Sequence, residues 1–261
     1  MRNKEHKISA LLITFNEVEN IKAVLENIDF ADEIIVVDSF SKDGTVELIK
    51  TYEQVKLIQR PFKNYTDQKS FALKQASYEW VLFLDADERV TDKLKKEIVQ
   101  TVKNDETDYV AYYFLRTFMF KNKVLRFSGW QSDKNYRLFK KDKVSFKQDR
   151  IVHETLKVNG KSGTLKNRLL HYSYKNYEEY KGKMIKYGKM RAKEAYKQGK
   201  RASWFHFVLR PTYKFLNHYI LRLGFLDGQK GLIICYLNAL GVYARYKELK
   251  HLQKNVNLQQ S

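Results

Sequence analysis

The sequence predicts an α/β protein with a basic, mostly helical C-terminal extension, and three observations support this prediction. Between residue 8 and about residue 100, apolar runs alternate with helical patterns. Alternation of this kind is typical of a mostly parallel sheet that is covered by helices on both faces. The segment 109–170 is rich in aromatic residues and strand-like, which predicts further, antiparallel strands. From residue 173 onward, apolar residues recur at helical spacing among lysines and arginines.

The expected parallel strands are apolar runs, separated from one another by helical patterns. In chain order the runs are ISALLITF, EIIVVD, VKLIQR and WVLFLD. Their apolar residues are continuous rather than alternating, which indicates strands with both faces buried. The first run follows a basic start but meets Asn16 and Glu17 without a small-residue cleavage site, so we expect a strand there and not a signal peptide.

The segment 175–201 predicts a basic amphipathic helix. Its apolar residues lie at spacings close to one helical face, surrounded by lysines. The residues of this face are Tyr177, Tyr180, Met184, Tyr187, Met190 and Ala195. The following stretch mixes aromatic and aliphatic residues with arginines, which suits a membrane interface or a basic-faced helical unit that packs on the α/β domain. No apolar stretch in the sequence approaches the ~18 to 20 residues that a bilayer-spanning helix needs.

The positive charge is concentrated in the C-terminal part of the chain. Residues 157–261 hold 22 lysines and arginines against 5 aspartates and glutamates, which accounts for +17 of the formal net charge of +19. Such a surface attracts an anionic partner, which is a nucleic acid, an anionic lipid or a phosphorylated substrate. The single cysteine, Cys235, excludes an internal disulfide framework and fits a reducing, cytoplasmic-side location.

Polar side chains follow three of the predicted parallel strands. Thr14 and Glu17 follow the first strand, Asp38 ends the second, and the acids of WVLFLDADERV end the fourth. Ligands of open α/β sheets bind beyond the carboxyl ends of the strands, so we expect these groups at one binding edge, where they suit a base and ribose hydroxyls. The sequence contains no GxGxxG fingerprint and no Walker lysine motif, which removes the main support for dinucleotide and P-loop interpretations.

The acids Asp85 and Asp87 suggest a metal site. On extended backbone, residues i and i+2 point to the same side, so we expect the two carboxylates together. Divalent cations such as Mg²⁺ or Mn²⁺ take one or two carboxylates together with diphosphate oxygens and water. The alternative is that the acids open a helix, where exposed N–H groups favour them. We expect that role for Glu88, with Thr91 or Asp92 as the helix cap.

Four motifs, in their order and spacing, resemble the inverting glycosyltransferases of family 2: ITFNE, IIVVDSFSKDGT, NYTDQKSFAL and LFLDADE. The resemblance continues through SGWQSDKNYRLFKK, IVHETL and YILRLGFLDGQKG, and these are similar to the branch that includes lipopolysaccharide-core glucosyltransferases. It covers nearly the whole chain. It implies a Rossmann-like GT-A domain over residues 1–172, with a donor half at 1–100 and an acceptor half at 101–172. Residues 173–261 would be the basic helical region that contacts the membrane surface and the acceptor.

The resemblance also implies roles for individual residues toward a nucleotide-diphosphate-sugar donor. Asp87 would bind the metal, Mg²⁺ or Mn²⁺, and Asp85 the metal or the ribose. Lys69, in DQKSFAL, stands where the family often has arginine. The implied donor-binding residues are Thr14, Glu17, Asp38, Lys69 and Asp85.

An inverting transfer needs a base that takes the proton of the acceptor hydroxyl while its oxygen attacks the anomeric carbon. In RIVHETL we expect Glu154 to be this base and His153 to contact the diphosphate or the metal. Asp133 is the competing base, in a loop that we expect to border the acceptor together with Trp130 and Arg137. Trp130 either stacks on a sugar ring or packs in the core.

These expectations predict a hexosyltransferase that moves glucose from UDP-glucose to a lipid-anchored saccharide such as lipopolysaccharide core. The basic tail would hold it peripherally on the anionic inner face of the cytoplasmic membrane. An alternative enzyme transfers the sugar to a polyprenyl phosphate. A non-enzymatic alternative is a basic nucleic-acid-binding protein whose tyrosines stack on bases. That alternative leaves the acids at the sheet edge unexplained, so we do not expect a nucleic-acid partner.

Overall fold

The chain divides into two units. The computed structural model describes residues 7–104, 108–120, 123–130, 133–147, 155–174 and 176–257. The first unit consists of Met1–Arg116 and Asp133–His171, and the second of Thr117–Ser132 and Tyr172–Ser261. The second unit thus includes a segment before residue 133 in addition to the C-terminal helices. The predicted domain boundary after residue 172 stays a prediction.

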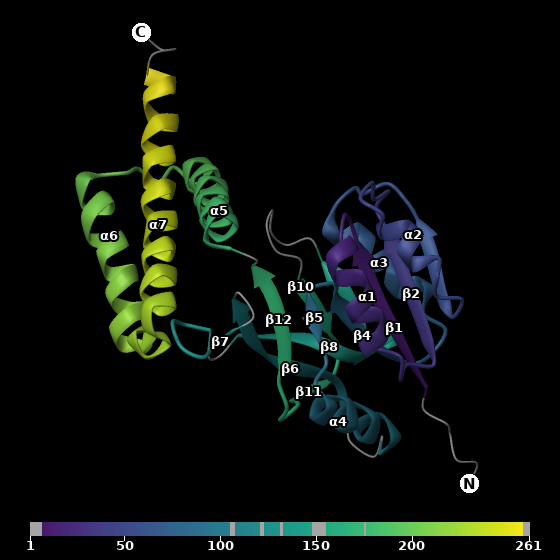
Figure 1. Cartoon of the computed structure of the whole chain (residues 1–261). Helices are drawn as coiled ribbons and strands as arrows, with labels where there is room; N and C mark the ends of the chain where they lie inside the picture. The colour runs from purple at the N-terminus through teal and green to yellow at the C-terminus, as the bar shows by residue number, and fades with distance from the viewer. Residues whose placement is uncertain are drawn as a thin grey trace. The chain divides into compact units, whose positions relative to one another are not determined.

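Figure 1 shows how strands and helices follow one another along the chain. The strands are β1 (Ile8–Thr14), β2 (Glu33–Asp38), β3 (Val55–Gln59), β4 (Trp80–Asp85), β5 (Glu88–Arg89), β6 (Tyr109–Phe120), β7 (Lys123–Leu125), β8 (Lys134–Lys140), β9 (Val144–Lys147), β10 (Thr155–Val158), β11 (Lys161–Thr164) and β12 (Leu169–Tyr174). The helices are α1 (Val18–Asn27), α2 (Thr45–Ile49), α3 (Tyr65–Gln75), α4 (Asp92–Lys103), α5 (Tyr177–Lys197), α6 (Trp204–Leu216) and α7 (Gly228–Asn257), with the short helices η1 (Lys141–Lys143), η2 (Asn217–Leu221) and η3 (Gly224–Asp227).

The sheet of the first unit begins with parallel strands in the order β3-β2-β1-β4. β1 runs parallel to both β2 and β4, and β2 runs parallel to β3. β8 then pairs antiparallel with β4, and β6 pairs antiparallel with β8. The four predicted parallel strands are therefore confirmed, and so are the antiparallel strands of the aromatic-rich segment, except that β11 pairs parallel with β6.

The strands β1, β2 and β4 are largely apolar because helices cover both of their faces, whereas the edge strand β3 has no fully buried residue. Leu12 and Val36 belong to a buried cluster that contains residues of α1 and α4. Leu11 and Ile35 belong to the cluster of the opposite face, which contains Ala72 of α3. Successive residues of a strand point to opposite faces, so one continuous apolar run supplies both clusters.

Side-chain caps begin three of the helices. Asn64 caps α3, Thr91 caps α4 and Asn176 caps α5. In each case the side-chain oxygen accepts a hydrogen bond from the backbone N–H three residues later, at 2.8 to 3.2 Å. The cap satisfies one of the N–H groups that have no partner inside the helix. The prediction that Thr91 caps a helix is confirmed.

The second unit contains the helices α5, α6 and α7, and α7 packs against both of the others. The amphipathic helix predicted within 175–201 is α5, and its buried residues are Tyr180, Gly188, Ala192 and Ala195. The apolar stretch GLIICYLNALGVYA lies within α7. Among the described helices, none is long and apolar enough to cross a membrane.

A carboxylate joins η3 to the loop that follows β7. Asp227 accepts hydrogen bonds from the backbone N–H groups of Arg126 and Phe127 and from the hydroxyl of Ser128, each at 3.0 Å. The carbonyl oxygen of Ser128 lies 2.8 Å from Nδ1 of His218 in η2. Burial lowers the pKa of His218 to about 4, so the ring is neutral near pH 7 and donates through this nitrogen. Asp227 of the GFLDG motif is therefore an anchor for this loop.

Helices α5 and α7 approach closely because glycines face one another. A Cβ atom on Gly188 would lie 2.4 Å from the carbonyl oxygen of Gly241, and a Cβ atom on Gly241 would lie 3.0 Å from the carbonyl oxygen of Met184. Both distances are shorter than ordinary van der Waals contact, and the atoms that would be met are backbone. The spacing of the two helices therefore depends on the absence of these side chains.

Gly188→Ala is expected to lower the free energy of unfolding by ~1 to 3 kcal/mol, because the added methyl group overpacks the contact between α5 and α7. Thermal or urea unfolding of the two proteins measures this. The matched control is Gly182→Ala in the same helix, where an added Cβ meets no atom within 4 Å. The control should raise stability by roughly 0.5 to 1 kcal/mol, as alanine does in helices. Equal effects of the two substitutions would contradict the packing argument.

Candidate active site

The carboxyl ends of three parallel strands lie at one edge of the sheet. Thr14 pairs with Asp38 in the register of β1 and β2, and Ile13 pairs with Asp85 in the register of β1 and β4. The hydroxyl of Thr14 donates to Asp38 at 3.1 Å. The structure therefore brings Thr14, Asp38 and Asp85 to a common edge, as the sequence predicted.

Asp38 is fully buried, and its carboxylate organises the loop that follows β2. Its oxygens accept hydrogen bonds from the backbone N–H of Ser41 at 2.9 Å and from the Ser41 hydroxyl at 2.5 Å. Nε2 of Gln59 approaches the same carboxylate at 3.4 Å. The Ser41 hydroxyl oxygen in turn accepts from the backbone N–H of Asn16 at 2.8 Å, which ties the loops after β1 and β2 together. The predicted contact of Asp38 with a nucleoside stays a prediction.

Glu17 is half-buried at the start of α1. Its backbone N–H donates to the hydroxyl of Thr45 at 2.9 Å, and its carboxylate accepts from Nδ2 of Asn20 at 2.8 Å. The carboxylate of Asp43 accepts from the backbone N–H groups of Val18 and Thr45, each at 3.1 Å. Asp43 therefore holds a turn against the first turn of α1, and Glu17 lies beside that turn.

The carboxylate of Asp85 lies between two cations. One oxygen accepts a hydrogen bond from the guanidinium of Arg137, and the other lies 3.8 Å from Nζ of Lys69. Burial alone would raise the pKa of Asp85, but Arg137 and then Lys69 outweigh burial and hold this pKa well below its ordinary value. Asp85 is therefore a carboxylate at any pH near neutrality.

Glu88 is completely buried and lies in β5, not in a helix. Its carboxylate accepts from Arg137 at 2.7 Å and from the backbone N–H of Asp85 at 3.1 Å, and Nη1 of Arg116 lies 3.5 Å away. The expectation that Glu88 serves in the first turn of a helix was wrong. A charge at this depth needs a partner of opposite sign, and Arg137, itself 5% exposed, supplies it.

The chain turns at Ala86 and Asp87, directly after β4. The guanidinium of Arg89 holds this turn by donating to the carbonyl oxygen of Ala86 at 2.6 Å. Asp85 and Asp87 are therefore not alternate residues of an extended strand, and the expectation that they point to one side for that reason was wrong. Asp87 Oδ2 instead lies 3.2 Å from Nε2 of His171.

His171 is the site residue that the sequence analysis missed. It lies in β12 and pairs with Glu88 of β5 in the antiparallel register. Only this pairing brings it to the turn that carries Asp87, 84 residues away along the chain. The sequence offered one weak signal, which is a histidine inside the otherwise apolar and aromatic run LLHYSY.

The residues predicted on the acceptor side lie in different surroundings. Asp133 Oδ2 accepts from Arg116 at 2.6 Å, so these two side chains hold each other in place. Trp130 belongs to the second unit, where its ring packs on Phe118 with centroids 4.0 Å apart. This arrangement favours core packing for Trp130. The predicted base Glu154 and the predicted contact residue His153 lie outside the described residues.

The groups at Asp87 fit a divalent cation. A carboxylate oxygen and an imidazole nitrogen are suitable ligands for Mn²⁺, and these two lie together at this edge. In the part of the chain that the structure describes, no group of three or more His, Cys, Asp or Glu residues is placed to hold a metal. Two protein ligands leave room for diphosphate oxygens and water, which is how such ions are usually bound with nucleotides.

Comparisons with known proteins agree with this fold. A profile of "Glycosyl transferase family 2" matches residues 9–164. An uncharacterized glycosyltransferase of Rickettsia typhi is 31% identical over 256 residues, which cover 94% of this chain and 87% of the relative. The lipopolysaccharide core biosynthesis glycosyltransferase LpsC of Rhizobium meliloti is 27% identical over 251 residues, which cover 92% of this chain and 93% of LpsC.

A solved structure of the same architecture is the mannosyltransferase PcManGT from Pyrobaculum calidifontis, in complex with GDP-Man and Mn²⁺. The TM-score is 0.51 at 16% identity, and the alignment covers 98% of this chain and 81% of that one. The fold is thus the α/β fold of GT-A glycosyltransferases, with a helical C-terminal region. The chain belongs to glycosyl transferase family 2, and it is an enzyme of the glycosyltransferase class. The fold class and the family that the sequence motifs predicted are confirmed.

Arg137→Met is expected to lower the free energy of unfolding by ~3 to 5 kcal/mol, because it leaves the buried carboxylate of Glu88 without its 2.7 Å partner. In the variant, the free energy of unfolding should also fall less at acidic pH than it does in the wild type. The pKa of Asp85 in the folded protein lies below the ordinary ~3.9, so its contribution to stability is complete above that pH and is lost as the pH falls further. Urea unfolding at neutral pH and at several acidic values measures both effects.

Lys161→Met is the matched control, since Lys161 pairs with Asp108 at 2.9 Å on the surface of the same unit. Exposed ion pairs contribute little, so this variant should follow the wild type at every pH. An Arg137→Met protein with unchanged stability would show that the buried ion pairs do not hold this edge together.

Proposed function

We propose that the protein is an inverting hexosyltransferase that moves glucose from UDP-glucose to a lipid-anchored saccharide of the lipopolysaccharide-core type. The observation that carries the proposal is the edge of the sheet, where an anchored carboxylate at Asp85 stands beside a carboxylate and imidazole pair at Asp87 and His171. The acceptor class is supported by the similarity to LpsC, which extends over 93% of that protein.

The donor is assigned to the loops that follow β1, β2 and β4. Thr14, Glu17 and Asp38 would face the nucleoside, since they stand at the ends of neighbouring strands where α/β folds bind nucleotides. Asp85 would bind the ribose or take part in metal binding, with its charge and position set by Arg137 and Lys69. Lys69 is 7% exposed, so it would act on the donor mainly by positioning Asp85.

Asp87 and His171 would hold the divalent cation, Mn²⁺ or Mg²⁺. A cation bound there would stabilise the negative charge of the diphosphate leaving group. The chain itself positions the two ligands: Arg89 fixes the turn that carries Asp87, and the pairing of β12 with β5 fixes the strand that carries His171. The mannosyltransferase PcManGT, which has the same fold, was solved with Mn²⁺ and GDP-Man.

Glu154 is proposed as the general base. Its carboxylate would take the proton of the acceptor hydroxyl while the hydroxyl oxygen forms a bond to the anomeric carbon and the bond from that carbon to the diphosphate breaks. Asp133, the competing candidate, is bound through Oδ2 to Arg116 at 2.6 Å. This contact supports a role for Asp133 in positioning Arg116, and it favours Glu154 as the base.

A lipid-anchored acceptor places the enzyme at a membrane surface, and we assign it to the inner face of the cytoplasmic membrane as a peripheral protein. The charge of the C-terminal part supports this assignment, since residues 157–261 carry a net +17. Each basic residue near an anionic bilayer contributes ~1 kcal/mol to attachment.

Asp87→Asn and His171→Ala are each expected to weaken UDP-glucose binding in the presence of Mn²⁺ by about 10- to 100-fold, and to remove the difference between Mn²⁺ and EDTA. Calorimetric titration of the nucleotide sugar measures this directly, without any acceptor. The control is Asp108→Asn, an acid with an 81% exposed side chain in the same unit. Metal-dependent binding that survives in both site variants would refute the assignment of the metal ligands.

Glu154→Gln should leave UDP-glucose binding intact and lower kcat by about 10²- to 10⁴-fold, because general-base catalysis contributes that much. Release of UDP in the presence of a core oligosaccharide acceptor gives the rate. Asp133→Asn is the comparison. Because it breaks the contact with Arg116, we expect it to lower the thermal midpoint of unfolding and to change kcat little. A near-normal rate for Glu154→Gln together with a large loss for Asp133→Asn would move the base to Asp133.

A further inference from the structure

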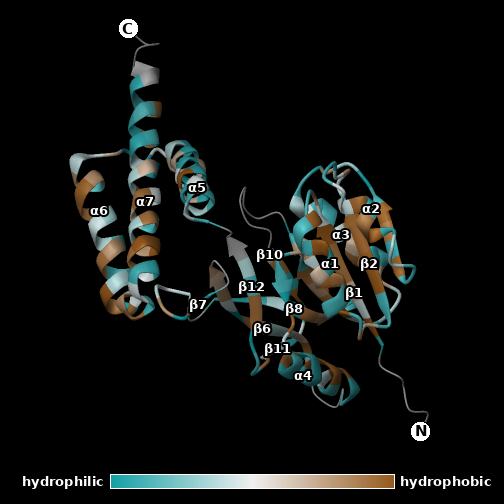
Figure 2. Cartoon of the chain, in the orientation of Figure 1, coloured by the Kyte–Doolittle hydropathy of each residue, from teal (hydrophilic) through white to brown (hydrophobic). Residues whose placement is uncertain are grey.

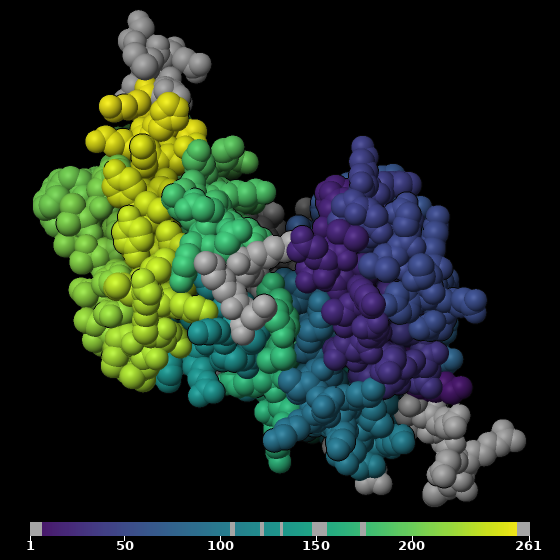
Figure 3. Space-filling model, viewed as in Figure 1, coloured from purple at the N-terminus to yellow at the C-terminus, as the bar shows by residue number. Residues whose placement is uncertain are grey.

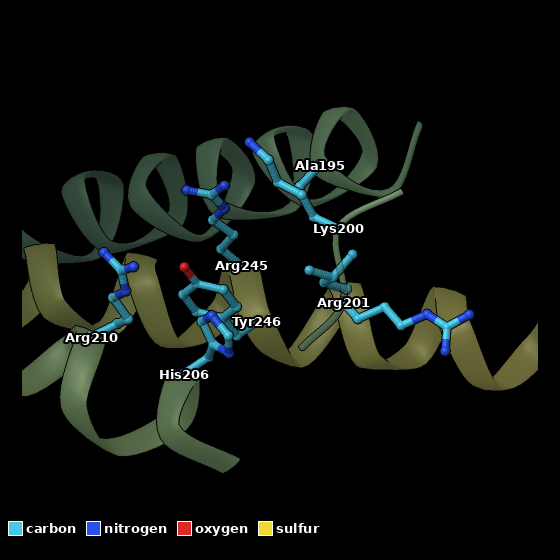
Figure 4. A pocket seen from close by; sticks show the side chains of 8 residues that line it. Ala195, Lys200, Arg201, His206, Arg210, Arg245 and Tyr246 are labelled. Carbon is cyan, nitrogen blue, oxygen red and sulfur yellow. The ribbon is translucent and has the colours of Figure 1, made fainter. Parts of the chain in front are cut away.

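A pocket of about 360 Å³ lies between the helices of the second unit. Residues from α5, from the linker between α5 and α6, from α6 and from α7 line it, and most of them are basic (Figure 4). The lining side chains that matter for its chemistry are Lys200, Arg201, His206, Arg210, Arg245 and Tyr246. Its lining contains no carboxylate, so the charged side chains that line the pocket are all cationic.

The cations of this pocket have no anionic partner within the described part of the chain. None of Lys200, Arg201, Arg210 and Arg245 forms an ion pair with a described residue, and Nε of Arg245 is buried without a hydrogen-bond partner there. In Figure 4 the side chains of Arg210 and Arg245 extend in the same direction, with the hydroxyl of Tyr246 between them. Two guanidinium groups arranged in this way match the oxygens of a phosphoryl group, which they bind through several N–H donors.

His206 gives the pocket a further donor. Its Nδ1 accepts a hydrogen bond from the backbone N–H of Ser203 at 3.0 Å, so the proton of the neutral ring lies on Nε2. The ring packs on Tyr246 with centroids 4.6 Å apart, which fixes its plane. The pocket also lies at the start of α6, where the positive end of the helix dipole favours an anion.

The same helix exposes a large apolar surface. Within the 13 residues of α6 no side chain is buried. The exposed side chains are Trp204 (67%), Phe205 (49%), Val208 (55%), Leu209 (53%), Tyr213 (65%) and Leu216 (44%). Hydropathy colouring shows the apolar character of this helix, in contrast to the hydrophilic C-terminal end of α7 (Figure 2). On a helix of 3.6 residues per turn, His206 and Arg210 form a strip beside this apolar arc.

The apolar surface continues beyond α6. Ile220, Leu221, Phe225 and Leu226, in the turns between α6 and α7, are also between 47% and 72% exposed. The space-filling view shows α6 and the neighbouring part of α7 as outward-facing surface of this unit (Figure 3). Exposed apolar side chains that gather on one helix and the adjoining turns mark a site of contact with a membrane or a protein, and the cations of the neighbouring pocket favour an anionic membrane.

We propose that the pocket binds the phosphoryl group of an anionic lipid while the apolar side of α6 rests among the acyl chains. A lipid is the occupant that satisfies both features, since it offers a phosphate and an apolar chain a short distance apart. The proposal rests on the proposed function for its purpose, because an enzyme with a lipid-anchored acceptor has to remain at a lipid surface. The binding itself involves only residues of the second unit.

Binding of the full chain to vesicles tests the proposal. The vesicles contain phosphatidylcholine alone, or phosphatidylcholine mixed with phosphatidylglycerol or phosphatidic acid, and co-sedimentation gives the affinity. Arg210→Gln combined with Arg245→Gln should weaken binding to the anionic vesicles about 100-fold, since each residue removes charge-assisted hydrogen bonds. The matched control, Lys189→Gln combined with Lys254→Gln, removes the same charge from exposed positions of α5 and α7 and should lose less than about 10-fold.

Two further measurements separate the alternatives. Vesicles with brominated acyl chains should quench the fluorescence of Trp204, and Trp204→Phe should lose that quenching. Inorganic phosphate is added as a competitor, and NaCl of the same ionic strength is the reference. Phosphate should displace no more protein from the vesicles than NaCl does. Equal losses in the pocket and control variants, absence of quenching, or full displacement by inorganic phosphate would each overturn the proposal.

UDP-glucose titration on the same variants distinguishes this proposal from the proposed function. Normal donor binding in a pocket variant that has lost vesicle binding shows that the fold is intact and that the two sites are separate. Normal vesicle binding in a protein that binds no nucleotide sugar would refute the proposed donor and leave the lipid pocket standing. Arg210→Lys combined with Arg245→Lys keeps the charge and should recover part of the vesicle affinity.

Discussion

The buried guanidinium of Arg137 holds the candidate active site together. It lies in β8, an antiparallel strand, and it pairs with Asp85 at the end of a parallel strand and with Glu88 in β5. Charges at this depth are stable only when they are paired, so the three side chains have to occupy their positions together. Through this cluster the antiparallel part of the sheet determines where the acids after β4 are placed.

The acids that look equivalent in the sequence therefore differ in the structure. Glu88 is a buried structural partner, Asp85 is an anchored carboxylate whose charge two cations maintain, and Asp87 stands on a turn beside His171. Of the three acids, Asp87 is the one that lies next to an imidazole nitrogen, and this pair is the one proposed to share a divalent cation with a diphosphate. The difference between the three acids follows from how deeply each is buried and from which side chains contact it.

The two units use positive charge in opposite ways. In the first unit, Arg137 and Arg116 are matched by carboxylates at hydrogen-bond distance. In the second unit, Arg210 and Arg245 line a pocket that has no carboxylate in its lining, and the adjoining helix exposes its apolar side chains. The paired cations of the first unit stabilise the candidate active site. The cations and the apolar side chains of the second unit are available to a ligand that carries both an anionic group and an apolar part.

The sequence by itself determined the parallel strands, the basic helices and the edge on which Thr14, Asp38 and Asp85 meet, because continuous apolar runs and strand ends are local features. Only the tertiary structure decided that Glu88 is buried and that His171 reaches Asp87. Those outcomes depend on strands brought together from 49 to 84 residues away, and no local pattern records which distant side chain will face a given acid. The predicted base at Glu154 remains a prediction made from sequence motifs, since that residue lies outside the described part of the chain.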